Sequence, residues 1–596
     1  MIPYSPPLDD MRFSLEEVAD LAGISALPGC EAAAPDTVMA ILDEAAKLAR
    51  DVLAPLNDVG DKNPAKLENG VVRTPPGFKE AYKTYVEGGW NSLPFEEEFG
   101  GQALPAVVAL AVAEMWQSAN MGWGLCPLLN FGAVEALQSH GSRELQERYL
   151  PKLISGEWTG TMNLTEPQAG SDVGALRSRA VPEGDHWRIT GQKIFITYGD
   201  HDYTDNIIHL VLARTPGAPS GTKGISLFLV PKVMVEADGS LGERNDVRTV
   251  SLEHKLGIHA SPTAVLSYGD NGGAAGWMIG QENRGMECMF TMMNSARLNV
   301  GLQGIAISER AYQQARDYAR NRVQGKPMTA RGPDDTAIIH HPDVRRMLLA
   351  MKTRTEAARG LAYFAAASID RARHTEDAET RALAQAQVDL LIPLVKSWST
   401  DLGVENASLG VQIHGGMGFI EETGAAQHYR DARILPIYEG TNGIQALDLI
   451  GRKVGRDRGA AAERFLALIG ETEAALADQP GDDLGTIRSL LAEAREAVAE
   501  ATRRIVALSA EDPARAAAAA TPYLNLFAVT AGGWVLAKQA LAAQARLANR
   551  EGDPKFNETK ILGARFYAEQ YLPSVAAAMG AIEGGRTILA VDPAYL

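Results

Sequence analysis

The chain has 596 residues, of which 46% are hydrophobic and 22% are charged. At roughly 150 residues per domain, this length excludes a single core and predicts three or four domains, and the composition excludes a disordered chain. The formal charge of −17, from 57 basic and 74 acidic residues without a basic run, argues against nucleic acid as a partner.

The N-terminal segment, residues 1–34, is acidic and proline-rich and lacks the basic and apolar regions of a secretory signal. Two apolar stretches, 103–113 and 526–537, are shorter than the ~20 residues that cross a bilayer. We therefore expect them to form core helices, and we expect no membrane partner. The three cysteines fit neither a disulfide framework nor a zinc site, so we expect a cytoplasmic protein without a metal.

Helical and strand patterns alternate along the rest of the chain. Apolar residues at three- and four-residue spacing predict a helical domain over 35–160. Residues 161–280 contain short runs rich in Ile, Val, Thr and Tyr, which predict a β domain. Helical spacing returns over 281–455 and predicts a second helical domain. After a Gly- and Arg-rich linker at 451–461, Ala-rich segments predict an additional helical domain over 456–596.

A single carboxylate, Glu439, stands in the stretch ILPIYEGTNGIQ, residues 434–445. The apolar and aromatic residues before it are Ile434, Leu435, Ile437 and Tyr438. Burial without a cationic partner disfavours the charged form of a carboxyl group, so we expect a raised pKa and a proton acceptor near neutral pH. The structural alternative is a surface carboxylate at a helix end.

Nucleotide-binding motifs of the common kinds are absent from the sequence, because neither GxGxxG after a strand nor GxxxxGK[ST] occurs. The glycines of QIHGGMGF (412–419) could admit a phosphate to backbone amides, or could simply end a helix. The stretch NLTEPQAGSDVGA (163–175) supplies hydroxyls and amides in a compact loop, or a capping turn. In the strand at 191–199, Phe195 and Thr197 are expected on one side, where they could wall a flat heterocycle.

Seven stretches in this order resemble the acyl-CoA dehydrogenase family over about residues 35–455. They are FEEEFGG (95–101), NLTEPQAGSD, GQKIFIT, HKLGIHASPT (254–263), IGQENRGM (279–286), QIHGGMGF and RDARILPIYEGTNGIQ (430–445). The resemblance implies a mainly α fold with a central β domain: a helical domain, a β-barrel-like domain and a four-helix bundle, with FAD bound between them. A C-terminal helical extension follows in this chain.

The resemblance also implies an activity, the FAD-dependent dehydrogenation of an acyl-CoA thioester to the trans-2-enoyl-CoA. Glu439 would take the α-proton, and a hydride would leave the β-carbon for flavin N5. The N–H of Glu439 would help to polarise the thioester oxygen, and Gly440 would leave room for that approach. Some relatives carry the base in the stretch that matches MNSARLNV (293–300), which contains no acid here, so Glu439 is the only candidate.

Further site residues follow from the resemblance position by position. The expected FAD contacts are Met162, Leu164, Thr165, Gly170, Ser171, Phe195, Thr197, Arg322, Gln324, Gln412, Gly416 and Thr441. The expected substrate contacts are Ser171, Arg297, Tyr438 and Glu439. Phe195 departs from the family, because many members have tryptophan there. Arg322 is otherwise a solvated helix residue, and Arg297 otherwise caps or pairs within a helix.

The extra length at both ends resembles a subfamily of large bacterial acyl-CoA dehydrogenases. That subfamily includes enzymes of dimethylsulfoniopropionate breakdown that oxidise 3-(methylthio)propanoyl-CoA, and enzymes for medium or long fatty acyl chains. The sulfur-containing substrate is the leading hypothesis. The resemblance implies a homodimer in which each flavin is shared between subunits, with an electron-transfer flavoprotein as electron acceptor.

Three other functions stay open at this point. An acyl-CoA oxidase shares the fold and the base but passes electrons to oxygen. A DNA-associated flavoprotein of the same superfamily would carry a basic patch on its C-terminal helices, and the tail from Gly459 onward shows no basic stripe. A helical scaffold without flavin would purify as a colourless protein.

Overall fold

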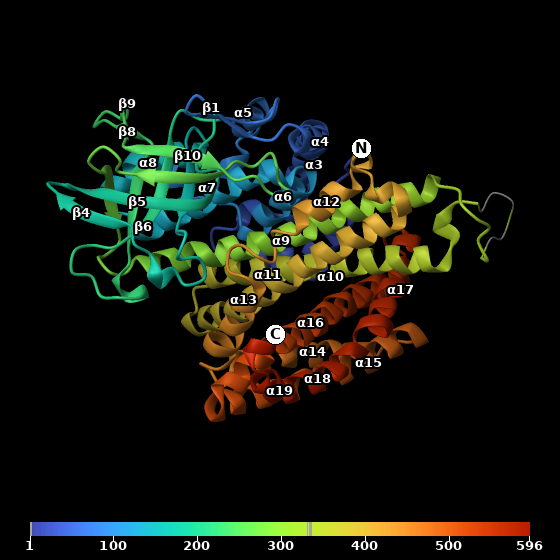
Figure 1. Ribbon diagram of the computed structural model, residues 1–596. Coiled ribbons are helices and arrows are strands. Elements are labelled where there is room, and N and C mark those ends of the chain that lie inside the picture. The colour runs from blue at the N-terminus through green and yellow to red at the C-terminus, as the bar shows by residue number, and fades with distance from the viewer. Residues whose placement is uncertain (1–2, 330–331, 333–335) are drawn as a thin grey trace. The chain divides into compact units, whose positions relative to one another are not determined.

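The runs rich in β-branched residues form one eight-stranded sheet, ordered β10-β11-β5-β12-β7-β6-β3, with β4 paired to β5. The computed structural model (Figure 1) describes residues 3–329, 332 and 336–596. The strands of the sheet are β3 Thr159–Asn163, β4 Arg179–Glu183, β5 His186–Thr197, β6 Ile207–Ala213, β7 Ser226–Pro231, β10 Val247–Leu252, β11 Thr263–Tyr268 and β12 Ala274–Ile279. Within it, β3 and β6 are parallel and the other pairs are antiparallel.

Two compact units interleave along the chain. The bundle unit comprises Met1–Ala46, Pro105–Ser118 and Val300–Leu596. The sheet unit comprises Lys47–Leu104 and Ala119–Asn299. Each unit buries its own set of large apolar side chains, as an independently packed core requires.

The sheet unit also contains helices, of which α7 packs on the sheet against β3 and β5. These helices are α4 Ala54–Lys62, α5 Phe78–Glu87, α7 Met121–His140 and α8 Arg143–Ser155. The buried amide of Asn130 on α7 joins three elements, because its Nδ2 donates to Leu153 O of α8 at 2.9 Å and its Oδ1 accepts from Gly160 N of β3 at 2.9 Å. This side chain fixes the start of β3, the strand that leads into the NLTEPQAGSD loop.

Helices form the bundle unit, as the apolar spacing predicts. They are α1 Leu8–Glu17, α2 Leu21–Ser25, α3 Pro35–Leu48, α6 Ala106–Ala119, α9 Gly285–Asn321, α10 Pro342–His374 and α11 Ala378–His414. Two short helices, α12 Ala425–Ala432 and α13 Asn442–Asp448, follow α11 and flank the segment that contains Glu439. The first turns of α9 belong to the sheet unit, so this helix passes from one unit into the other.

A buried guanidinium joins three helices of the bundle unit. Arg359 of α10 donates through Nε to Glu114 of α6 at 2.8 Å and through Nη2 to Glu309 of α9 at 2.8 Å. Tyr363 Oη donates to the second oxygen of Glu114 at 2.7 Å. The Arg359 and Glu114 side chains are each 1% exposed, so removing one partner would leave a buried charge without compensation.

The additional C-terminal helices pack on the bundle through α16, which contacts α10, α11 and α13 (Figure 1). These helices are α14 Ala460–Ala477, α15 Asp482–Glu511, α16 Pro513–Asn549, α17 Pro554–Tyr571, α18 Pro573–Glu583 and α19 Gly585–Ala590. The predicted linker is partly helical, because a π-helix spans Leu449–Val454 and buries Leu449, Ile450 and Val454.

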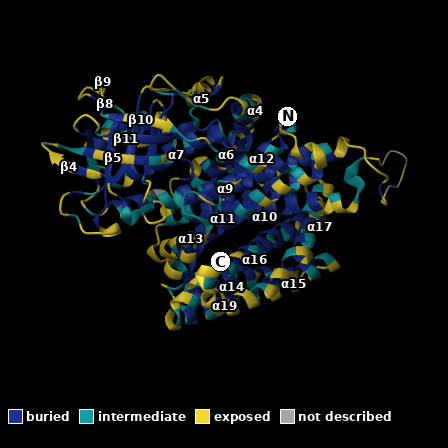
Figure 2. Ribbon diagram, in the orientation of Figure 1, coloured by how far each residue is buried: buried dark blue, intermediate teal, exposed yellow. Residues whose placement is uncertain are grey.

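The apolar stretch 526–537 is part of the much longer helix α16. Among the described residues, α16 with 37 residues is the one helix long and apolar enough to cross a membrane by length and composition. Of its most apolar window, 78% is buried inside the protein, and Figure 2 shows α16 mostly in the colour of buried residues. Burial, and not length, therefore marks it as a core helix of the bundle unit.

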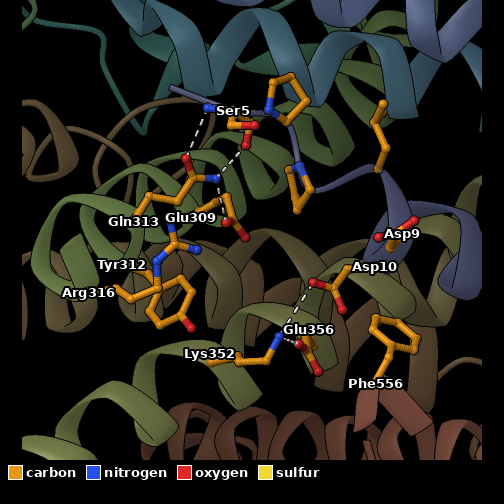
Figure 3. A pocket seen from close by; sticks show the side chains of 13 residues that line it. Ser5, Asp9, Asp10, Glu309, Tyr312, Gln313, Arg316, Lys352, Glu356 and Phe556 are labelled. Carbon is orange, nitrogen blue, oxygen red and sulfur yellow. Dashed lines mark hydrogen bonds and ion pairs between the residues drawn. The ribbon is translucent and has the colours of Figure 1, made fainter. Parts of the chain in front are cut away.

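A cluster of largely buried charges ties the N-terminal segment to the C-terminal helices, and Figure 3 shows three of its members, Asp10, Lys352 and Glu356. Lys560 Nζ of α17 lies 2.6 Å from Asp10 of α1 and 3.1 Å from Glu356 of α10. Lys352 of α10 pairs with the same two carboxylates. Burial alone would raise the pKa of Asp10, but attraction to Lys560 and Lys352 outweighs it and holds that pKa well below its usual range. The cluster borders a cavity of about 510 Å³.

Replacing Arg359 tests the buried network. Arg359→Met leaves Glu114 and Glu309 without their cation, and we expect it to lower the free energy of unfolding by about 3 to 5 kcal/mol. Urea titration followed by the helical circular dichroism signal measures the change. Arg346→Met is the matched control, because Arg346 lies on the same helix but is 51% exposed and pairs with exposed Asp343. A loss no larger than that of the control would contradict the assignment.

Candidate active site

The Glu439 segment is a series of turns between α12 and α13. Leu435 is fully buried, Ile434, Tyr438 and Glu439 are half-buried, and Ile437 is 47% exposed. The apolar residues before Glu439 are therefore only partly buried. Residues adjacent in sequence point in different directions because the segment turns at each step, so the surroundings of Glu439 are set by other elements.

The backbone at Glu439 is in the left-handed region, with φ of +54°. Gly440 follows with φ of +80°, a conformation that glycine adopts without a steric penalty. For a residue with a side chain, the left-handed region costs of order 1 to 3 kcal/mol and persists only where the surrounding contacts over-determine it. Strained backbone of this kind clusters at functional sites, so its presence at the predicted proton acceptor is consistent with a functional role for the segment.

Side chains of the bundle unit hold this segment. Lys396 of α11 donates from Nζ to Leu435 O at 3.0 Å and to Gly440 O at 2.8 Å. Gln445 Nε2 lies 3.3 Å from Glu439 O. Neither Lys396 nor Gln445 is among the predicted site residues: Lys396 lies outside the motifs, and Gln445 ends the stretch 434–445 without a chemical signature of its own.

Tyr438 is anchored through its hydroxyl. It donates to Gln303 Oε1 of α9, and Gln303 Nε2 donates in turn to Gln117 Oε1 of α6 at 3.1 Å. Burial, reinforced by the neighbouring Glu439, raises the pKa of Tyr438, so the hydroxyl stays protonated and remains a donor. The residue before the predicted base is thereby fixed to two helices.

The NLTEPQAGSD loop of the sheet unit is held by an ion pair whose side chains are 0% and 3% exposed. Lys193 Nζ of β5 lies 2.8 Å from Glu166 Oε1 and donates to Leu164 O at 3.0 Å. Ile194 N also donates to Thr165 O, at 2.9 Å. Lys193 and Glu166 were not predicted as site residues, although Glu166 stands inside the motif.

The ionisation of this pair follows from burial and mutual attraction. Burial alone would raise the pKa of Glu166, but attraction to Lys193 and hydrogen bonds from Lys193, Ser178 Oγ and Arg177 N–H lower it to about 2. Burial lowers the pKa of Lys193 to about 8, with Glu166 opposing the shift. Both groups are therefore charged at neutral pH.

The predicted flavin contacts of the sheet unit lie around this loop. Met162 is buried on β3, Leu164 and Thr165 are half-buried, and Gly170 and Ser171 are exposed. A Cβ built on Gly170 would meet no atom within 4 Å, so the backbone there is accessible. The structure thus gathers the predicted residues on one strand end and one loop.

Phe195 lies where the strand alternation is interrupted. The register of β5 against β11 shifts between Lys193 and Ile196, and Phe195 has φ of +58°. The predicted placement of Phe195 and Thr197 on one side assumes a regular strand. That assumption is wrong, because a β-bulge adds a residue to β5 at this point. Ile196 is buried, whereas Thr197 is half-buried and the Phe195 ring is 58% exposed. An aromatic ring is thereby presented away from the core.

The remaining predicted residues occupy three places. Arg322 and Gln324 are exposed and joined by a 3.3 Å hydrogen bond, and Gln412 and Gly416 are exposed at the end of α11, all in the bundle unit. Thr441 caps α13, because its Oγ1 accepts from Ile444 N at 3.3 Å. Arg297 is in the sheet unit, on the first turns of α9, and is only 3% exposed.

Four family models match consecutive parts of the chain. They are the acyl-CoA dehydrogenase N-terminal domain (residues 35–157), middle domain (161–270) and C-terminal domain (283–455), and an acetyl-CoA dehydrogenase C-terminal-like domain (456–592). The chain is also 50% identical over 575 residues to the 3-methylmercaptopropionyl-CoA dehydrogenase of Ruegeria pomeroyi, covering 96% of this chain and 97% of that protein. The chain belongs to the acyl-CoA dehydrogenase family.

Two further comparisons agree with this. The chain is 37% identical over 601 residues to a butyryl-CoA dehydrogenase of Syntrophomonas wolfei, covering 98% of this chain and 97% of that protein. A solved acyl-CoA dehydrogenase of Bacillus anthracis, in complex with FAD, matches with a TM-score of 0.72 at 21% identity, covering 93% of this chain and 88% of that one. The predicted fold class is confirmed, including the C-terminal helical extension. The protein is an acyl-CoA dehydrogenase, and the prediction of an oxidoreductase acting on an acyl-CoA is confirmed.

FAD is the cofactor implied by the family. The residues present suit it, because the exposed Phe195 ring offers a face to a flat heterocycle and the rigid loop after β3 offers hydroxyls and accessible backbone. The exposed Arg322 guanidinium suits a pyrophosphate in charge and shape.

Replacing Glu166 tests the buried pair that holds the NLTEPQAGSD loop. The pKa of Glu166 in the folded protein is below its ordinary value of 4.5, so its charge stabilises the fold above about pH 4.5 and this contribution is lost as pH falls toward about 2. We expect Glu166→Gln to lower the free energy of unfolding at pH 7 by about 1.5 to 3 kcal/mol, the range for a hydrogen bond to a charged group. The difference from wild type should shrink below pH 4.5.

Urea titrations at several pH values measure this difference, and FAD absorbance after gel filtration reports retention of the cofactor. Glu183→Gln is the control, because Glu183 is an exposed carboxylate on β4 that pairs with Arg188. An equal effect of both substitutions, or a difference that does not change with pH, would show that burial of the Glu166 charge is not the cause.

Proposed function

We propose that this acyl-CoA dehydrogenase oxidises 3-(methylthio)propanoyl-CoA to the corresponding 2-enoyl-CoA in the breakdown of dimethylsulfoniopropionate. The supporting observation is the 50% identity to the enzyme of Ruegeria pomeroyi, which extends over 96% of this chain and therefore includes the C-terminal helices. The butyryl-CoA dehydrogenase at 37% identity supports a second candidate, a fatty acyl-CoA dehydrogenase. Butanoyl-CoA, the substrate that its name gives, has a four-carbon acyl group.

Glu439 is proposed as the base that removes the α-proton. A carboxylate can accept that proton only if it is held at the α-carbon and its charged form is not stabilised by water. The turns around Glu439, fixed through Tyr438, Leu435 and Gly440, provide a carboxylate at a defined place. FAD, when bound, supplies the acceptor for the hydride that leaves the β-carbon.

The N–H of Glu439 is proposed to donate to the thioester oxygen as negative charge develops on it. Glu439 and Gly440 have left-handed backbone, so the chain is not helical at the residue that would present this N–H. Arg297 and Ser171 are proposed as contacts of the CoA ester, and the flavin contacts are those named above for each unit. Because every relative reported above is called a dehydrogenase, an electron-transfer flavoprotein is proposed as the electron acceptor in preference to oxygen.

A homodimer is proposed as the active form. Arg322, Gln324, Gln412 and Gly416 are exposed on the bundle unit, as residues that reach a partner's flavin would be. Exposed apolar side chains adjoin Gly416, among them Met417 at 48% and Phe419 at 85%, and apolar surface of this kind favours association. A cytoplasmic location is also proposed, since the three cysteines are buried free thiols, which suits a reducing compartment.

Substitution of Glu439 tests the base. We expect Glu439→Gln to retain FAD and to bind acyl-CoA, but to reduce flavin at least about 10² to 10⁴ times more slowly, because only the proton acceptor is removed. Anaerobic stopped-flow absorbance measures the rate. Glu422→Gln replaces an exposed glutamate in the same unit and should leave the rate unchanged. Wild-type turnover by Glu439→Gln would reject the assignment.

Substrate choice is tested by anaerobic mixing of the purified protein with 3-(methylthio)propanoyl-CoA, butanoyl-CoA and octanoyl-CoA. We expect the sulfur-containing substrate to bleach the flavin fastest at equal concentration, if the similarity to the Ruegeria enzyme extends to the acyl pocket. A clear preference for butanoyl- or octanoyl-CoA would keep the chemistry and assign the enzyme to fatty acid oxidation.

A further inference from the structure

Lys396 is a fully buried ammonium in the middle of α11. Its Nζ donates to Leu435 O at 3.0 Å, to Gly440 O at 2.8 Å and to Asn442 Oδ1 at 2.9 Å. An ammonium group has three hydrogens to donate, and each of these three oxygens can accept one. A buried cation costs free energy unless its donors are met, so these contacts constrain the segment that supplies the oxygens.

Two of those oxygens stand on either side of the proposed base. Leu435 precedes Glu439 and Gly440 follows it, so one nitrogen atom ties both ends of the turn that carries the carboxylate. The third oxygen belongs to Asn442, the first residue of α13. The ammonium of Lys396 therefore connects α11 with the Glu439 turn and with the start of α13.

Asn442 extends the same contact along α11. Its Nδ2, which carries two hydrogens, lies within hydrogen-bond distance of three acceptors: Ser397 O at 3.1 Å, Thr400 Oγ1 at 3.0 Å and Asp401 Oδ1 at 2.8 Å. These acceptors follow Lys396 within about one turn of the helix. A short stretch of α11 thus forms a cradle of polar groups for the Glu439 segment, which we call the α11 cradle: Lys396, Ser397, Thr400 and Asp401.

The strained backbone explains why such a cradle is needed. Glu439, with φ of +54°, occupies a region that residues with side chains rarely adopt, and without external contacts the turn would relax to a more extended or helical form. Hydrogen bonds to the carbonyls on both sides of Glu439 oppose that relaxation. The direction of the Glu439 side chain depends on this backbone conformation.

We propose that Lys396 is a positioning residue for the dehydrogenation, which holds Glu439 in the orientation that removes the α-proton. The inference rests on the proposed role of Glu439 as the base. Misplacement of a reacting group by about 1 Å can slow a reaction by about 10²-fold, so loss of the cradle should act on the chemical step while acyl-CoA binding is retained.

The first experiment replaces Lys396 by methionine, which keeps the length of the side chain and removes its donors. We expect Lys396→Met to reduce flavin with substrate about 10²-fold more slowly, with FAD content and the Kd for acyl-CoA within about twofold of wild type. Asn442→Ala should also slow flavin reduction while FAD content and the Kd for acyl-CoA are retained. If Lys396→Met does not fold, these three measurements on Asn442→Ala test the proposal. Anaerobic stopped-flow and equilibrium titration measure the two quantities.

The second measurement isolates proton removal. An acyl-CoA whose sulfur directly follows the α-carbon has α-hydrogens but no β-hydrogen, so deprotonation by the enzyme cannot proceed to hydride transfer. The resulting anion beside the oxidised flavin is detected as a long-wavelength absorbance band. We expect Lys396→Met to bind this analogue and to show a much weaker band than wild type.

A matched control separates positioning from the general loss of a buried ammonium. Lys352 on neighbouring α10 is half-buried, with 23% of its side chain exposed, and it pairs with Asp10 and Glu356 away from the Glu439 segment. Lys352→Met should retain both the wild-type rate of flavin reduction per bound FAD and the wild-type band.

The outcomes distinguish this proposal from the one on which it rests. If Glu439→Gln keeps the band, Glu439 is not the base and the proposed mechanism fails. If Glu439→Gln loses the band while Lys396→Met and Asn442→Ala both keep the wild-type band and rate, the positioning role is overturned. Loss of FAD and of acyl-CoA affinity in step with the rate, in Lys396→Met and Asn442→Ala alike, would also overturn it in favour of a purely structural role.

Discussion

Buried cations that must find oxygen partners are the constraint on which this structure depends. Moving an ammonium or guanidinium out of water costs several kcal/mol even after relaxation, so each one dictates where carbonyl and carboxylate oxygens lie around it. Lys193 places the loop after β3, Arg359 joins α6, α9 and α10, and Lys396 places the turn of Glu439. In each case the cation stands on a regular element and its partners include a segment distant in sequence.

This arrangement gives irregular loops the precision of a helix or strand. The proposed base and the proposed flavin contacts lie on turns and loops, where functional groups are commonly found, but a loop alone positions side chains poorly. Here the backbone oxygens of those loops are the acceptors for a buried lysine on the neighbouring element. The strain at Glu439 and the bulge at Phe195 persist beside these contacts, which is how a protein keeps an unfavourable local geometry at a working site.

The same physics joins the two ends of the chain. Asp10 near the N-terminus and Lys560 near the C-terminus meet at Glu356 of α10, so α1 and α17 are bound to one another and to the bundle. The apolar helix α16 is buried between the bundle helices and the other C-terminal helices, where it also contacts α13, the helix that begins directly after the Glu439 turn. The C-terminal helices are therefore part of the core of the bundle unit, and α13 connects them with the segment that carries the base.

The sequence by itself determined the class of the fold, the alternation of helical and β regions, the family and the identity of Glu439 as the candidate base, because periodicity and short motifs are local properties of the chain. By resemblance it also proposed Phe195 and the NLTEPQAGSD loop as flavin contacts. Only the tertiary structure decided which polar residues hold those motifs. Lys193, Lys396 and Gln303 look like ordinary polar residues of a strand or helix, and their importance depends on burial and on partners supplied by other segments. The exposure of Ile437 and the bulge at Phe195 were likewise beyond sequence reasoning, since the direction of a side chain in a turn or a bulge is set by packing against distant elements.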